Sequence, residues 1–140
     1  MGTRRRAREY ALQMLYLWEF HKEFDPVVVE DFWKERPQDD ATTREFTMGL
    51  VSGVISHLAE IDEMIKQCST NWRIDRMATV DRNILRVAAF ELQHMADTPL
   101  KVVLNEAIEL GKRYGSEDSG SFVNGVLDKV GATLRPPSKK

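Results

Sequence analysis

Apolar residues recur at intervals of three and four along almost the whole chain, whereas the alternating runs that half-buried strands need are missing. The clearest stretch contains Phe46, Leu50, Val54, Leu58, Ile61, Ile65 and Cys68. This spacing places the apolar side chains on one face of a helix. We therefore predict an all-α fold, in which Gly49 and Gly53 allow a second helix to approach closely.

Chain length and composition indicate a single domain. A chain of 140 residues with 42% hydrophobic content can bury one core but is too short for two. We assign residues 1–134 to a compact bundle of about seven helices and residues 135–140 to a mobile tail. Within the bundle we consider two helical subassemblies, at about 1–70 and 71–134.

Capping and turn residues mark the expected helix ends. The expected helices cover about residues 4–20, 26–37, 40–68 (one long helix or two end to end), 78–95, 99–115 and 116–131. Asp25 and Asp97 each stand shortly before a proline that starts a helix. We expect Glu117 and Asp118 in the first turn of the last helix, where the helix dipole favours acids, and Gly131 at its end.

The sequence offers no sign of secretion, membrane insertion or metal binding. No apolar run approaches the roughly 18–20 residues that cross a bilayer, and no signal peptide follows the initial charges. The lone Cys68 suits a reducing compartment, so we expect a cytoplasmic protein. His21, His57 and His94 lack ligand spacing, and we expect no metal and no cofactor.

Catalytic motifs are also missing. The glycines Gly115, Gly120 and Gly125 step by five and match no phosphate-binding loop. Glu106 and Glu109 could share one helix face, but the histidine that a di-metal helix needs is absent, so a solvated face is the better interpretation. We predict that the protein is not an enzyme.

A basic cluster opens the chain. Arg4, Arg5, Arg6 and Arg8 run directly into a helical apolar stripe, although the formal net charge of the chain is -2. Tyr16 shares a flank of this helix with Arg5, and single-stranded RNA binders combine such cations with a stacking aromatic ring. The alternative is that Tyr16 is half-buried core and the arginines only keep the terminus solvated. The pattern alone leaves both open.

Three segments, RRRARE with ALQMLYLWE, VDRNILRVAAFEL, and PLKVVLNEAIELGKRYGSEDSGSFVNGVLDKV, together resemble the NusB family of transcription antitermination factors. The resemblance implies an all-α, non-catalytic protein that binds the boxA element of ribosomal RNA leader transcripts together with the ribosomal protein NusE. NusA, NusG and RNA polymerase would be indirect partners in the same complex.

The same resemblance assigns roles to individual residues. It implies RNA contacts for Arg4, Arg5, Arg6, Arg8, Tyr16, Glu117, Asp118 and Phe122, and NusE contacts for Asp81 and Arg86. Charge complementarity with a basic ribosomal protein is compatible with the last two, and local salt bridging is their alternative. Phe122 could stack on a base, although an aromatic residue beside apolar neighbours is more often core.

Two departures from the family pattern bear on these roles. Ser121 stands where many members carry a basic residue, so one phosphate contact could be missing. Asp81 replaces the common Glu and shortens that arm by one methylene. A related reading, the NusB-like domain of certain RNA methyltransferases, leaves no room for a catalytic domain here. A third reading is a helical homo-oligomerising or ribosomal-RNA-assembly interaction module, with a homodimer possible.

Overall fold

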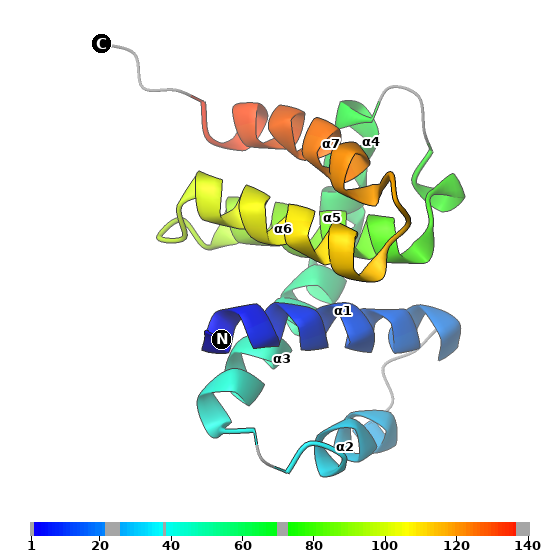
Figure 1. Cartoon of the computed structure of the whole chain (residues 1–140), viewed down its shortest axis with the longest axis vertical. Helices are drawn as coiled ribbons and strands as arrows, with labels where there is room; N and C mark the ends of the chain where they lie inside the picture. Colours follow the sequence, from blue (N-terminus) through cyan, green and yellow to red (C-terminus); the bar gives the residue numbers. More distant parts are fainter. Residues whose placement is uncertain (1, 22–25, 38, 70–72, 137–140) are drawn as a thin grey trace.

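The computed structural model describes residues 2–21, 26–37, 39–69 and 73–136, and the regular structure in these ranges is entirely helical (Figure 1). The elements are α1 (Thr3–His21), α2 (Pro26–Lys34), α3 (Ala41–Ser56), α4 (Leu58–Cys68), the short 3₁₀ helix η1 (Ile74–Arg76), α5 (Thr79–His94), α6 (Leu100–Tyr114) and α7 (Ser119–Leu134). The prediction of an all-α fold is confirmed. The expected helix over residues 40–68 is two helices that meet at His57.

Helix α5 organises the molecule because it contacts helices on every side. It packs against α1 and α3, which lie below it in Figure 1, and against α4, α6 and α7 on its other sides. Its residues Asn83–Leu92 are all buried. The two groups of helices therefore divide between α3 and α4, near residue 57, and not near residue 70 as the sequence suggested.

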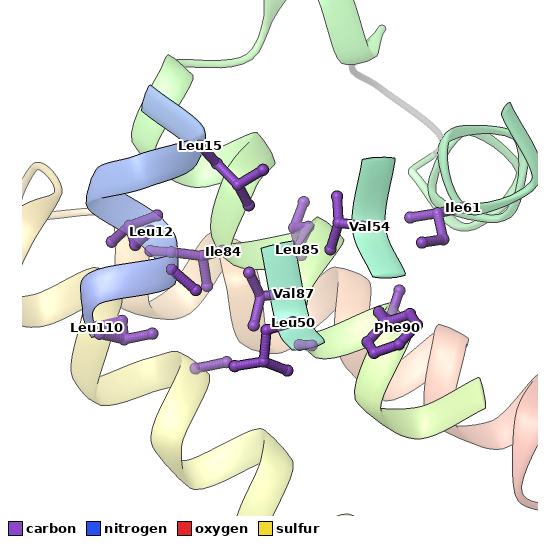
Figure 2. Close-up of a cluster of buried hydrophobic side chains, with 14 of the residues drawn as sticks. Leu12, Leu15, Leu50, Val54, Ile61, Ile84, Leu85, Val87, Phe90 and Leu110 are labelled. Carbon is purple, nitrogen blue, oxygen red and sulfur yellow. The ribbon is translucent and has the colours of Figure 1, made fainter. Parts of the chain in front are cut away.

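One continuous apolar core joins both groups (Figure 2). Leu12 and Leu15 of α1, with Leu50 and Val54 of α3, point toward α5. Ile61 of α4 reaches the same cluster and is completely buried. A shared core of this kind fits the single domain that the composition indicated.

One of the two glycines of α3 makes the predicted close approach. A Cβ atom built on Gly53 would lie 2.2 Å from the ring of Phe90, so α3 meets α5 where a side chain has no room. The other, Gly49, is exposed and has nothing within 4 Å of such an atom. The prediction is confirmed for Gly53 and wrong for Gly49.

The ends of α7 differ from the sequence-based expectation. Glu117 and Asp118 precede the helix, and its first turn contains no acid. The helix instead begins at Ser119, whose hydroxyl accepts a hydrogen bond from the Ser116 backbone N–H at 2.9 Å and so closes the turn before the helix. The helix continues past Gly131 to Leu134, because Gly131 is buried against Leu100 of α6 rather than ending the helix. The predicted cap at Asp25 lies outside the described residues.

Arg135, which the sequence analysis assigned to a mobile tail, is held by the end of α5. Its guanidinium donates hydrogen bonds to the backbone carbonyls of Leu92 (3.2 Å), Met95 (3.0 Å) and Thr98. Last-turn carbonyls of a helix lack partners within the helix, and Arg135 supplies a donor for that of Leu92. The assignment of Arg135 to the tail is therefore wrong. Among the described residues, no helix is long and apolar enough to span a membrane.

Candidate nucleic-acid interface

The first turns of α1 carry three exposed arginines, and each guanidinium has a specific contact. Arg5 donates from Nε and Nη2 to the carboxylate of Glu106 on α6, with a shortest distance of 2.6 Å. Arg6 donates from Nη1 to Asp39 at 3.0 Å. Arg4 lies over the ring of Phe46, 4.8 Å from its centroid. The arginines are exposed but held in a defined arrangement.

Arg8 belongs to the same basic run but lies in the interior. It is only 4% exposed, and its Nε and Nη2 donate to both carboxylate oxygens of Glu91, each at 2.7 Å. Such a forked, charge-assisted pair is strong and geometrically specific. The structure therefore places Arg8 in an ion pair between α1 and α5, away from the solvent-facing arginines.

Asp39 ties the arginine-bearing helix to the segment before α3. Besides Arg6, it accepts a hydrogen bond from the Tyr10 hydroxyl at 2.6 Å. Burial and this hydrogen bond to Asp39 both raise the pKa of Tyr10. The carboxylate side chain of Asp39 has no exposed surface, so it is a fixed anchor for two residues of α1.

A further basic residue near this surface was missed by the sequence analysis. Arg113 at the end of α6 is half-exposed and donates to Glu9 of α1. Glu9 also accepts a hydrogen bond from the Tyr114 hydroxyl at 3.2 Å. The only sequence signal was a basic residue in the last turn of a helix, which is common because of the helix dipole.

Tyr16 is 51% exposed and lines a groove of about 530 Å³ between α1, α2 and the start of α5. Tyr114, Phe32 and Val80 line the same groove. The structure does not place Tyr16 in the core, since its side chain is exposed and lies outside the apolar cluster. An exposed aromatic ring beside a groove is free to stack on a planar partner.

The start of α7 forms a second hollow, of about 300 Å³. Asp118 and Phe122 line it together with Asp81 of α5 and Arg76 of η1. One carboxylate oxygen of Asp81 is buried and has no hydrogen-bond partner among the described residues. Asp81, assigned by resemblance to a protein contact, thus lies beside residues assigned to RNA. Glu117, also assigned to RNA, is exposed just before α7.

Arg86, the second residue assigned to a protein partner, is buried. Its Nε and Nη2 donate to the carboxylate of Asp62 at 2.8 and 2.9 Å, and its Nη1 donates to Asn83 at 3.0 Å. Glu19 of α1 is a further ion-pair partner at 3.3 Å. Although burial disfavours the charged form, these partners raise the pKa of Arg86. The structure agrees with the local salt-bridge alternative for this residue.

Within the part of the chain that the structure describes, no cluster of three or more histidine, cysteine or carboxylate side chains could hold a metal ion. The side chains that the site presents are arginines, exposed tyrosines and carboxylates. These groups bind phosphates, planar bases and the charged side chains of proteins.

A helical bundle that presents ordered arginines and exposed aromatic rings has the make-up of an RNA-binding module. Comparison with known proteins is more specific. The model of the NusB family matches residues 5–132, and the chain belongs to that family.

The relatives match over nearly their full length. The transcription antitermination protein NusB of Anaeromyxobacter dehalogenans is 53% identical, over 99% of this chain and 96% of its own. The protein of the same name from Myxococcus xanthus is 46% identical, over 98% of this chain and all of its own.

Solved structures agree with these relatives. T. maritima NusB is 37% identical with a TM-score of 0.81, over 91% of this chain and 89% of that one. A structure of the antitermination factors NusB and NusE in complex with double-stranded RNA is 30% identical with a TM-score of 0.85, over 95% and 98% of the two chains. The family resemblance of the sequence is confirmed.

Proposed function

We propose that this protein is a transcription antitermination factor that binds the boxA element of ribosomal RNA leader transcripts together with NusE. In this role it would join NusA, NusG and RNA polymerase on the transcript in the cytoplasm. Family membership supports the role, and a relative has been solved with NusE and RNA. The observation that carries the RNA contact is the set of exposed, ordered arginines on α1. The proposal assigns no catalytic step to the chain.

The proposed RNA surface includes Arg4, Arg5 and Arg6 for phosphates and Tyr16 for an unpaired base. Guanidinium groups bind phosphates in a forked geometry, while stacking on a tyrosine tolerates any base. Exposure of Tyr16 favours single-stranded RNA, because paired bases offer no free face. Arg8 supports this surface through its buried pair with Glu91 and is left out of the direct contacts.

Base choice is proposed for the start of α7. Glu117 and Asp118 would accept hydrogen bonds from base amino groups, and Phe122 would stack at the rim of the adjoining hollow. Carboxylates repel phosphates, so these two residues would favour particular bases without adding general RNA affinity.

Removing two of the exposed arginines tests the RNA surface. The double variant Arg5→Ala/Arg6→Ala should bind boxA RNA more weakly and lower the log-log salt slope by roughly one to two, because each lost phosphate contact removes about 0.7 for single strands. Lys66→Ala is the matched control, since Lys66 is exposed on α4, away from α1. An unchanged slope in the double variant would remove these arginines from the RNA surface.

NusE is proposed to contact the protein near Asp81. Asp81 and the exposed Asp118 line the same hollow, and two acidic side chains there suit a cationic side chain of a basic ribosomal protein. Arg86 is left out of the direct contact, because its guanidinium is committed to Asp62, Asn83 and Glu19.

Charge reversal tests the partner surface. Asp81→Lys should weaken binding of isolated NusE by more than about 1 kcal/mol, while binding of isolated RNA stays unchanged or becomes slightly stronger. Calorimetry against each ligand alone measures both effects, with Asp128→Lys on the exposed face of α7 as the control. A selective loss of RNA binding would mean that the two surfaces have been exchanged.

Self-association is the second candidate function. Phe20 near the end of α1 is 74% exposed, and this side chain would suit an apolar contact with another copy. Light scattering with and without RNA separates the two functions, because RNA should dissociate an oligomer that covers the RNA surface. A stable oligomer that ignores RNA would favour the interaction module.

A further inference from the structure

Two of the arginines proposed to bind RNA are already bound by carboxylates of the same chain. Arg5 makes a forked contact with Glu106, and Arg6 contacts Asp39. A carboxylate and a phosphate present similar oxygen pairs to a guanidinium. Glu106 and Asp39 therefore occupy the donors that an RNA phosphate would use.

The carboxylates are fixed, whereas the arginines are able to move. The side chains of Arg5 and Arg6 are each 45% exposed, but Glu106 is only 14% exposed and Asp39 is fully buried. Glu106 is also held 3.7 Å from the buried Arg8. When an arginine turns toward RNA, its carboxylate stays behind and opposes the phosphate.

The charge of Glu106 is well stabilised. The hydrogen bond from Arg5 lowers its pKa, with further lowering by the nearby positive charges of Arg5 and Arg8, and partial burial only opposes this. Glu106 is therefore ionised at neutral pH and competes with phosphate at full charge.

We propose that Glu106 is a specificity-determining residue of the RNA surface, and that Asp39 acts in the same way on Arg6. The inference rests on the proposed RNA-binding function and adds a role that opposes binding. The phosphate of any single-stranded RNA must displace a fixed carboxylate before it gains the Arg5 contact. Cognate RNA also makes base contacts near α7 that hold it on the surface during this exchange, whereas non-cognate RNA has only its phosphates and a stacking contact that any base can make.

The test compares boxA RNA with a single-stranded RNA of the same length and unrelated sequence, using wild type and Glu106→Gln. The variant should bind the unrelated RNA about fivefold more tightly, and boxA RNA less than about twofold more tightly. Its salt slope on the unrelated RNA should rise by about 0.7, as one phosphate contact is gained. In an Arg5→Ala background, Glu106→Gln should not raise the slope.

Glu109→Gln is the matched control. Glu109 lies three residues further along the same helix, is exposed, and pairs loosely with Lys112 at 3.9 Å, while its charge acts on Arg5 without a hydrogen bond. Its loss removes the same charge without releasing an arginine of α1. Equal effects of the Glu106 and Glu109 variants would reduce the proposal to general electrostatics and overturn it.

Two further outcomes are decisive. Weaker boxA binding by Glu106→Gln would overturn the inference, because it would mean that Glu106 positions Arg5 for phosphate. If neither wild type nor variant binds boxA RNA in the presence of NusE, the proposed function itself fails. Should Glu106→Gln not fold, Asp39→Asn with and without Arg6→Ala repeats the test at the second pair.

Discussion

Arg5 and Arg8 lie three residues apart in one basic run, yet they have opposite environments. Arg5 is on the surface, while the side chain of Arg8 is 5% exposed and faces Glu91. Residues three apart share one side of a helix, so the difference comes from their partners on other helices, Glu106 for Arg5 and the buried Glu91 for Arg8. The net effect of a substitution therefore depends on the position within the run.

Arg8→Ala should destabilise the protein by about 3–5 kcal/mol, because it leaves the buried carboxylate of Glu91 without its partner. Urea unfolding measures the change in the free energy of unfolding. Arg5→Ala is the control, and it should change stability far less because its pair is exposed to solvent. Equal unfolding midpoints for the two variants would contradict the ion pair seen between α1 and α5.

Tyr16→Ala should cost about 1–3 kcal/mol of RNA affinity if the ring stacks on a base. Because Tyr16 is half-exposed, the melting temperature should change little. Tyr10→Phe is a useful comparison, since it removes a hydroxyl that donates to Asp39 and should affect stability instead. A large drop in melting temperature for Tyr16→Ala would assign the ring to the core.

Residue environments were the part of the site that the sequence predicted least well. The basic run and Tyr16 were recognisable because they are local in sequence and helical in spacing. The burial of Arg8 was not, since its partner Glu91 is 83 positions away. Arg86 was equally ambiguous, because its partner Asp62 lies on a different helix.

Helices α3 and α5 cross where Gly53 of α3 lies against the ring of Phe90. Because glycine has no Cβ atom, the Phe90 ring can reach the backbone of α3, and Phe90 is only 9% exposed. This is a close approach that only the smallest residue permits.

Gly53→Ala should destabilise the protein by about 1–3 kcal/mol, because the added methyl group overlaps the Phe90 ring. Gly49→Ala on the same helix should instead stabilise it by about 0.5–1 kcal/mol, since the new side chain meets nothing and alanine favours the helix. Thermal unfolding of both variants provides the comparison. Stabilisation by both would show that Phe90 moves aside freely.

Helix existence was predictable from periodicity, but helix ends were not. Gly131 has the local signature of a helix end, yet packing against Leu100 carries α7 on to Leu134. Glu117 and Asp118 have the signature of a first turn, yet the Ser116–Ser119 hydrogen bond starts the helix later. A tertiary contact overrode local propensity at Gly131, whereas a local hydrogen bond accompanies the later start of the helix.

Glu19 joins the two groups of helices. It extends from α1 and accepts hydrogen bonds from Arg82 and Asn83 of α5, each at 2.8 Å. Burial disfavours its ionised form, but these hydrogen bonds and nearby arginine charges outweigh burial and lower its pKa below the ordinary 4.5. The sequence analysis considered two helical subassemblies, whereas this polar connection between α1 and α5 could not be read from either segment alone.

The contribution of Glu19 to stability should depend on pH. Because its folded-state pKa is lowered, the contribution is fully present above about pH 4.5 and is lost as the pH falls through the lower folded value. Glu19→Gln should therefore be less stable than wild type at pH 7, with a difference that shrinks in acid. Urea unfolding between pH 7 and pH 3 measures this, with Glu45→Gln on the exposed face of α3 as the control. A constant difference across the range would contradict the ionised link.

The hydrogen bonds from Arg135 to the end of α5 affect the order in which the helices can be completed during synthesis on the ribosome. The backbone carbonyl of Leu92, in the last turn of α5, accepts a hydrogen bond from Arg135, a residue made 43 positions later. At a translation rate of roughly 5–20 residues per second, this donor becomes available about 2–9 s after Leu92 has been made. Helix α5, the centre of the described bundle, is thus completed at its carboxyl end only after α6 and α7 have been translated.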